Sequence, residues 1–200
     1  MEIEILDYTP SPVELISKSM GTCYGKSDTS EKRVKRAFVE QHMSVFEHAK
    51  VTVRISGVSR ALSHQLVRHR MASFCQESQR YVKVDVSEDW FVKPEFDDEV
   101  DEDVFDKAMQ FSAWAYAQLI NNGVPAEDAR YVLPNACKTT LVMTMNLREL
   151  YHFLYLREDS HAQWEIRDLA KALREKVSGI SDEWSMLMSL GKQDDTSQVS

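Results

Sequence analysis

The chain has 200 residues, 43% of them hydrophobic, which suits one folded domain with a sizeable core. No apolar run approaches the roughly 18 to 20 residues that span a bilayer. The N-terminus has no signal-like apolar core, so we expect a cytoplasmic protein. The net charge of −8 argues against a nucleic-acid partner, and three widely spaced cysteines offer neither a disulfide framework nor a metal site.

Local patterns predict an α+β fold of a single domain over residues 1–190, with a flexible tail over 191–200. Apolar–polar alternation predicts strands, and apolar residues at helical spacing predict helices. In chain order we expect a strand over 1–7, helices over 12–20 and 29–43, a strand over 50–56, a helix over 59–70, a polar loop over 71–79, a strand over 81–86, a helix over 101–121, a short helix between Pro125 and Pro134, a strand over 138–145, and helices over 147–156, 163–177 and 181–190.

The main concentration of positive charge is the run Arg68, His69, Arg70. Neighbours on a helix point about 100° apart, so three in a row fit a helix end better than a helix face. Guanidinium groups offer a planar fork to phosphate, and the small polar loop that follows can present hydroxyl and N–H groups to an anion. Arg80 restores a positive charge at the loop's far end. Alone, this indicates a phosphate or nucleotide pocket; a solvated helix end is the common alternative.

This run also resembles the signature of the flavin-dependent thymidylate synthases, which is Arg-His-Arg, seven residues, Ser, and then Arg and Tyr. Here it is Arg68-His69-Arg70, then Ser78, then Arg80-Tyr81. Four more segments are similar to that family in the expected order, and they are His42-x-Ser44-x-x-Glu47-His48, Ala129-Arg130-x-x-Leu133-Pro134, Asn146-x-Arg148-x-Leu150, and Leu156 to Glu165. Cys75-Gln76 stands where the family often has Asn-Glu, and His152 where some relatives have Asn.

The resemblance implies methylation of dUMP to dTMP, with 5,10-methylenetetrahydrofolate as carbon donor and FAD, reduced by NADPH, as hydride source. It implies a central antiparallel or mixed sheet flanked by helices, and a homotetramer with shared active sites. The implied dUMP-binding residues are Gln65, Leu66, Val67, Arg68, Gln76, Glu77, Ser78, Gln79, Arg80, Arg130 and Arg157. The implied FAD-binding residues are Ser44, Arg68, His69, Arg70, Gln76, Asn146, Leu147, Arg148 and His152, with His42 and His161 close to the flavin.

Physical roles can be attached to three of these residues. Arg80 and Arg130 would neutralise the dUMP phosphate. Arg157 matches the family's activating residue, because a cation beside uracil favours loss of the ring N–H proton and makes the ring carbon more nucleophilic. If the helix after Asn146 runs unbroken, Asn146 and Arg157 share one face roughly 16 Å apart.

Other residues and other functions compete with this interpretation. We expect Cys75 to be a bystander rather than a nucleophile, and Ser78 to bind ligand rather than attack it, because neither has an evident base partner. His161 could merely cap a helix. Aromatic side chains expected in the core are Trp114, Tyr116, Tyr151 and Tyr155. The runner-up function is a nucleotide-binding regulatory protein without catalysis; a nucleic-acid-binding module conflicts with the net charge.

Overall fold

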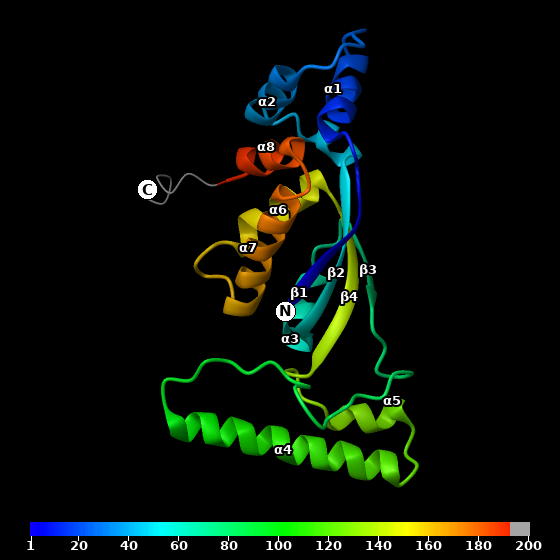
Figure 1. The fold of residues 1–200 in the computed structure, drawn as a ribbon, viewed down its shortest axis with the longest axis vertical. Coiled ribbons are helices and arrows are strands. Elements are labelled where there is room, and N and C mark those ends of the chain that lie inside the picture. Colours follow the sequence, from blue (N-terminus) through cyan, green and yellow to red (C-terminus); the bar gives the residue numbers. More distant parts are fainter. Residues whose placement is uncertain (193–200) are drawn as a thin grey trace.

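A four-stranded antiparallel sheet organises the protein, whose computed structural model describes residues 1–192. The tail predicted over 191–200 therefore falls almost wholly outside the described residues. The strands stand in the order β1-β2-β4-β3, and they are β1 (Glu2–Tyr8), β2 (Lys50–Ser59), β4 (Lys138–Asn146) and β3 (Ala72–Gln76) (Figure 1). The prediction of an α+β fold built on an antiparallel sheet is confirmed.

One face of this sheet carries the main core. Along β4, Leu141, Met143 and Met145 are at most 1% exposed, while the residues between them are half-buried, as alternation along a strand requires. Helices α3 (Arg60–Leu66), α6 (Leu147–Arg157) and α7 (Trp164–Ser178) contact strands of the sheet. Figure 1 shows α6 and α7 on one side of it, with α8 (Asp182–Leu190) above them. Each fully buried aliphatic side chain contributes about 1.5–3 kcal/mol to stability.

Helix α6 begins where β4 ends, and the junction is sharply defined. Asn146 has extended backbone, and its side-chain oxygen accepts a hydrogen bond of 2.9 Å from the backbone N–H of Glu149. The helix then continues without a break to Arg157. The helix that begins after Asn146 therefore reaches Arg157 unbroken, as the sequence analysis assumed for these two residues.

The end of the molecule beside the start of β2 is formed by α1 (Pro12–Thr22), α2 (Glu31–Val39) and the 3-10 helix η1 (Met43–His48). The helix predicted over 29–43 is wrong in its second part, because α2 ends at Val39. Gln41 adopts a φ of 57°, in the left-handed region, which a continuing right-handed helix excludes. The chain then enters η1, so His42 lies just before this 3-10 helix and Ser44 lies within it, and neither belongs to α2.

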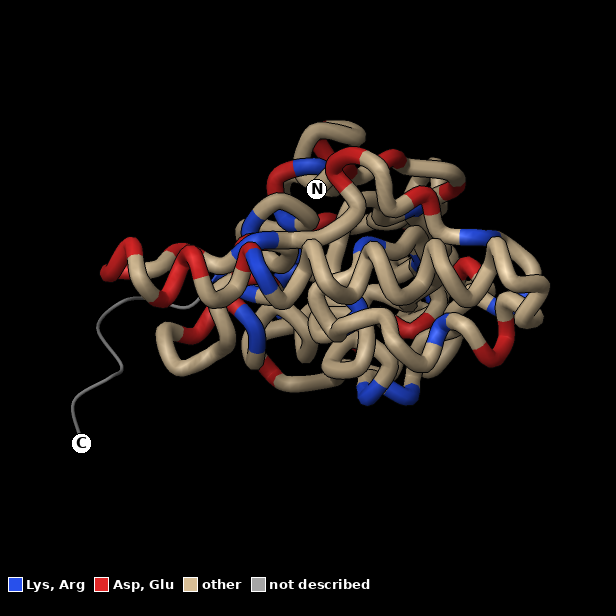
Figure 2. Tube along the Cα trace, turned by 90° about the horizontal axis from the view of Figure 1, so that it is seen from below, with Lys and Arg blue, Asp and Glu red and all other residues tan. Residues whose placement is uncertain are grey.

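The opposite end is built around the long helix α4 (Glu99–Asn121), with α5 (Ala126–Ala129) and the 3-10 helix η2 (Arg130–Val132) beside it (Figure 1). A second, smaller apolar cluster there centres on Trp90, Met109 and Cys137. Figure 2 shows acidic residues gathered at the start of α4, where Asp98 caps the helix. Carboxylates there are favoured by the helix dipole.

Two predictions in the middle of the chain are wrong. Residues 72–76, expected in a loop, form strand β3, and no strand forms over 81–86. Phe74 pairs with Met143 at the sheet edge, and Cys75 is exposed on the other face. Residues 81–86 contain β-branched side chains, but the backbone there has no ladder partner. Residues 72–76 form a strand because they pair with β4, and local propensity does not indicate which segments will find such a partner.

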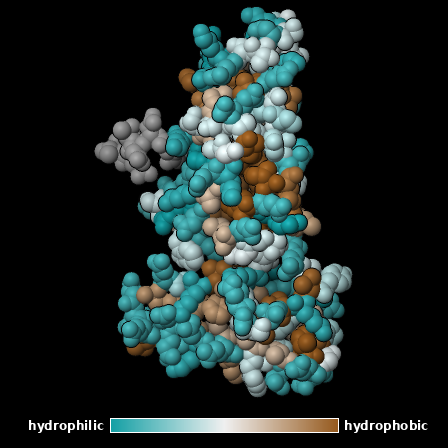
Figure 3. Space-filling view, viewed as in Figure 1, coloured by the Kyte–Doolittle hydropathy of each residue, from teal (hydrophilic) through white to brown (hydrophobic). Residues whose placement is uncertain are grey.

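Two of the four aromatic residues expected in the core lie at the surface instead. Tyr116 and Tyr151 are 2% and 7% exposed, as predicted, but Trp114 and Tyr155 are each 58% exposed. The Trp114 ring packs on Phe111 at 5.4 Å, also on the surface of α4. Figure 3 shows hydrophobic side chains reaching the surface among hydrophilic ones over this face of the molecule. No helix of residues 1–192 is long and apolar enough to cross a membrane.

Candidate active site

The predicted site residues fall into two groups in the folded chain. One group surrounds α6 and the loop 67–71, and the other lies where β3 ends and α5 begins. The helix predicted over 59–70 stops at Leu66, so the Arg68–Arg70 run lies in a turn beyond the helix end. Figure 1 places α6 and α5 in different parts of the molecule.

Arg157, the last residue of α6, is held by a buried histidine. Its Nε donates a hydrogen bond of 3.1 Å to His69 Nε2, and His69 Nδ1 lies 3.1 Å from Glu149 Oε1. The side chains of His69 and Glu149 are only 4% and 9% exposed. Since the Nε of arginine only donates, His69 Nε2 must accept, and the ring proton therefore lies on Nδ1, facing Glu149.

The environment of His69 keeps its ring neutral. Burial lowers its pKa below the ordinary value of 6.5; Arg157 and His152 act in the same direction, while Glu149 opposes them. A doubly protonated ring would present N–H at both nitrogens and could not accept from Arg157. The contact with Arg157 and the lowered pKa are thus two consequences of one arrangement. His69, expected at the flavin, acts within this chain as the support of Arg157.

Several predicted flavin residues line two neighbouring cavities. Asn146, Arg148 and His152 line one of about 390 Å³, together with Glu47, Met71 and Glu149. Ser44 and His42 line another of about 610 Å³, and Arg148 belongs to both. Arg148 also pairs with Glu47 at 2.5 Å, although both side chains remain well exposed. Residues of η1 and of the start of α6 therefore lie close together, around neighbouring cavities.

The charge beside these cavities is unbalanced toward cations. Arg68 and Arg70 are exposed, and neither forms an ion pair with a carboxylate within residues 1–192. Arg157 likewise contacts His69 rather than an acid. In a protein of net charge −8, arginines without carboxylate partners mark a surface that can bind an anion.

In the second group, Glu127 contacts both Arg80 and Arg130, and Ser78 contacts Arg80. Arg80 Nε lies 3.2 Å from the Glu127 carboxylate, and Arg130 Nε donates to the Glu127 backbone carbonyl at 3.0 Å. Ser78 Oγ accepts from the backbone N–H of Arg80 at 3.3 Å. Gln79, buried against Cys137, lines a cavity of about 290 Å³ together with Arg130. These side chains form a partly exposed corner that carries two arginines and is suited to phosphate.

Other predicted residues are not brought to either group. Leu66 and Leu147 are fully packed in the core, at 0% and 1% exposure, so their side chains cannot contact a ligand directly. Gln76 donates to Ser63 and Thr139 inside the sheet layer. Gln65 is half-buried, and Val67 and Glu77 are exposed.

His161 also lies apart from the predicted flavin residues. Its side chain is 92% exposed and contacts Asp159 at 2.8 Å, rather than lining a cavity with His42.

Three acidic residues beside the two groups, Glu149, Glu47 and Glu127, were not among the predicted site residues. Glu149 had a signal, since an acid three residues after an Asn helix cap is the spacing of a capping box. Its carboxylate instead turns to His69. Glu47 and Glu127 had none beyond their position in the quoted segments, because their arginine partners come from distant sequence or from the next turn.

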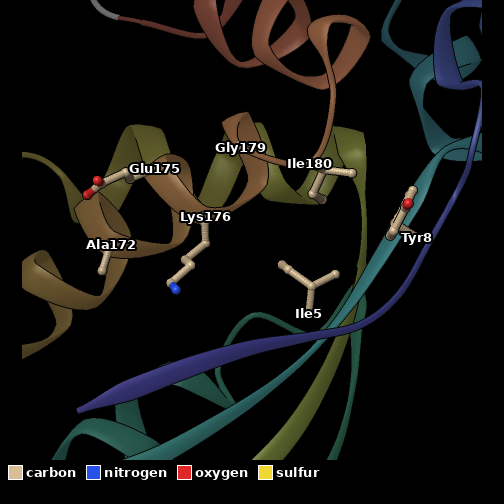
Figure 4. Close-up of a pocket in the computed structure, with 7 residues that line it drawn as sticks. All are labelled: Ile5, Tyr8, Ala172, Glu175, Lys176, Gly179 and Ile180. Atoms are coloured by element: carbon tan, nitrogen blue, oxygen red, sulfur yellow. The ribbon is translucent and has the colours of Figure 1, made fainter.

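A further groove of about 610 Å³ lies between β1 and α7 and contains none of the predicted site residues. Figure 4 shows its side chains, with apolar ones on the strand side and a Glu and a Lys on the helix. The lining residues are Ile5, Tyr8, Ala172, Glu175, Lys176, Gly179 and Ile180. Volume alone therefore does not single out the functional region; the clustered arginines do.

The fold and site define an α+β protein with an anion-binding surface divided between two parts of the chain, and comparison with known proteins places it in a family. The family model described as Thymidylate synthase complementing protein matches residues 4–181. The flavin-dependent thymidylate synthase of Geobacter sulfurreducens is 44% identical over 194 residues, covering 90% of this chain and 84% of the relative. That of Pyrococcus furiosus is 39% identical, covering 98% and 81%.

A solved structure agrees with these relatives. The flavin-dependent thymidylate synthase of Helicobacter pylori, complexed with FAD and dUMP, superposes with a TM-score of 0.78 at 26% identity, covering 96% of this chain and 100% of the other. The present chain therefore belongs to the flavin-dependent thymidylate synthase family. The resemblance inferred from the Arg68–Tyr81 run is confirmed.

Proposed function

We propose that this protein converts dUMP to dTMP with FAD as hydride carrier, NADPH as reductant and 5,10-methylenetetrahydrofolate as carbon donor. The observation that carries the proposal is Arg157, a cation that is supported by a buried neutral histidine and forms no ion pair with a carboxylate of residues 1–192. The relatives are named as flavin-dependent thymidylate synthases, and the Helicobacter pylori structure contains FAD and dUMP.

Arg157 activates the uracil ring in this proposal. Its Nε is engaged by His69, so the two terminal amino groups are available to a ligand. Placed against the uracil carbonyl and ring nitrogen, they stabilise the negative charge that develops when the N–H proton leaves. Ser78, Arg80 and Arg130 bind the phosphate, and Arg80 exchanges its contact with Glu127 for the more highly charged ligand.

The residues around the two cavities at α6 fit a flavin dinucleotide. Arg148 lines both cavities, of about 390 and 610 Å³, so the two lie next to each other. Arg68, Arg70 and Arg148 provide cations for the diphosphate, while Asn146 and His152 provide polar groups for the ring system. FAD supplies the hydride chemistry when bound; these side chains bind and orient it. Neither Cys75, exposed on β3, nor another cysteine is assigned a nucleophilic role.

A homotetramer with shared sites accounts for the separation of the two groups. Within one chain the phosphate-binding corner at α5 and the activating residue at the end of α6 lie apart (Figure 1). A symmetric assembly that sets α5 of one subunit against α6 of another would complete the site. Sedimentation at micromolar concentration should give a species of four subunits; a stable monomer that is fully active contradicts shared sites.

The deciding experiment is a reaction with purified protein, FAD, NADPH, dUMP and methylenetetrahydrofolate. We expect a yellow protein with flavin absorbance and formation of dTMP that depends on all four small molecules. Omitting dUMP is the control for NADPH oxidation by the flavin alone. Absence of dTMP with FAD saturated refutes the proposal, and binding of dUMP without flavin favours a non-catalytic nucleotide-binding protein.

A further inference from the structure

Glu149 is buried beside the site, and none of the assigned roles accounts for it. Its carboxylate oxygen Oε1 contacts His69 Nδ1 at 3.1 Å, and its side chain is 9% exposed. Taking a carboxylate out of water costs several kcal/mol unless specific partners compensate. Glu149 belongs to the first turn of α6, and Arg157 to the last, so His69 bridges both ends of one helix.

We propose that Glu149 is a positioning residue for the reaction, because it fixes the proton of His69 on Nδ1 and so makes Nε2 an acceptor for Arg157. This inference rests on the proposed role of Arg157 in activating uracil. A neutral histidine carries its proton on one nitrogen only. A carboxylate only accepts, so it selects the tautomer whose Nδ1 donates. With the other tautomer, Nε2–H would face Arg157 Nε–H, and two donors would repel.

The geometry makes the consequence for Arg157 specific. Its single bond to His69 uses Nε and leaves the two terminal amino groups of the fork unused by that contact. Loss of the Nε contact frees the guanidinium to rotate about its side-chain torsions. Errors of about 1 Å in a catalytic group reduce rates by about 100-fold. Glu149 thus controls a group it does not touch.

The other charged groups facing His69 support this assignment. Arg157 and His152, both on α6, disfavour a second proton on the ring, and burial adds to their effect; Glu149 acts against them. His152 lies with its ring centroid 6.0 Å from that of His69, and Phe153 packs on the same ring at 5.0 Å. Packing therefore fixes the orientation of the His69 ring, and the contact with Glu149 determines which ring nitrogen carries the proton.

The chain offers a matched control in Glu165. This residue is 5% exposed, lies in the first turn of the next helix, and accepts hydrogen bonds from the backbone N–H and hydroxyl of Ser59 at 2.7 and 2.5 Å. It is a buried carboxylate with a purely structural set of partners. A substitution of Glu165 reports the cost of removing such a group without disturbing His69.

The first test is the ¹⁵N spectrum of the histidine rings in the full-length wild-type protein between pH 6.5 and 8, with His69→Gln used to assign the His69 signals. We expect a neutral ring protonated on Nδ1. A ring protonated on Nε2, or one that is cationic over this range, overturns the inference. This result does not depend on turnover. Failure of dTMP formation with the expected tautomer would instead count against the proposed function.

The second test compares Glu149→Leu, Glu149→Gln and Glu165→Leu. We expect Glu149→Leu to lose the single Nδ1–H tautomer and to reduce kcat, measured per bound flavin, by about 10- to 100-fold. Glu149→Gln can turn its amide oxygen to His69, so we expect it to restore both properties to within about threefold of wild type. Glu165→Leu should lower stability while preserving the tautomer and the kcat of the folded protein. Equal kcat losses in Glu149→Leu and Glu165→Leu overturn the inference; should Glu149→Leu not fold, the wild-type spectrum and Glu149→Gln decide it.

Discussion

The two groups of site residues differ most in how their charged side chains are held. Around α6, His69 and Glu149 are 4% and 9% exposed and form a directed chain of hydrogen bonds that ends at Arg157. At the α5 corner, Arg80 and Glu127 are 51% and 50% exposed. A buried network has one arrangement and is costly to disturb, whereas an exposed pair exchanges partners readily.

This difference matches the two chemical tasks that we propose for the regions. A group that stabilises developing charge must be oriented before the reaction, because reorganisation during the step would consume the advantage. A phosphate-binding arginine needs only to reach a highly charged ligand, and its weak pair with Glu127 is easily replaced. Substitutions that disturb the orientation of Arg157 should therefore have a different effect from substitutions that weaken the attraction of the α5 corner for phosphate.

The largest effect is expected at Arg157. We predict that Arg157→Ala lowers kcat by about 100- to 1,000-fold, because it removes a donor to the charge developing on uracil. Flavin absorbance should be retained. Arg167→Ala is the matched control, since Arg167 is a half-buried arginine on α7 that donates to the backbone carbonyl of Ser160. Near wild-type turnover in Arg157→Ala would remove the activating role.

A smaller, different effect is expected at the α5 corner. We predict that Arg130→Ala raises the KM for dUMP by about tenfold while kcat changes by less than about twofold, because one charge-assisted hydrogen bond to phosphate is lost in ground and transition states alike. Arg54→Ala, which breaks an exposed pair with Glu4, controls for loss of positive charge. A fall in kcat with unchanged KM would mean that Arg130 stabilises the transition state. That result would contradict the proposed division between a phosphate-binding corner at α5 and an activating residue on α6.

The pH dependence of the free energy of unfolding tests the buried network around His69 in the absence of any ligand. Since the pKa of His69 is lowered in the folded state, the unfolded chain binds the proton first on acidification. The free energy of unfolding should therefore fall as the pH drops from about 6.5 toward the lowered pKa, and His69 should contribute no pH dependence above 7. Denaturant titrations across this pH range should give a free energy of unfolding that depends less steeply on pH in His69→Gln than in the wild type. An identical slope in that variant contradicts the neutral buried ring.

The smallest effect is expected from the exposed pair. Glu127→Ala should change the free energy of unfolding by less than about 1 kcal/mol, because an ion pair half open to water gains little over solvent. Denaturant unfolding of Glu127→Ala beside Glu149→Leu measures the contrast. If truncating Glu127 costs as much as truncating Glu149, the corner is rigid and the comparison between the two regions fails.

Much of the fold followed from local pattern, and the exceptions share one cause. Residues 50–56 and 138–145 alternate strongly and form strands, and 147–156 and 163–177 form helices close to the expected bounds. The strand over 72–76 was missed because a short, polar edge strand depends on its neighbour. Trp114 was placed wrongly because a large apolar residue at the surface has no local signature.

For the site, the spacing from Arg68 to Tyr81 identified the family, and the resemblance predicted the arginines and histidines of the site. It also implied that Asn146 and Arg157 share one helix, because helical rise is fixed by backbone geometry. Only the tertiary structure decided that His69 turns inward to support Arg157, that Glu149 faces it, and that Arg80 and Arg130 lie elsewhere. These contacts join residues 47 to 88 positions apart, and contacts at such separations are set by packing, which no local pattern encodes.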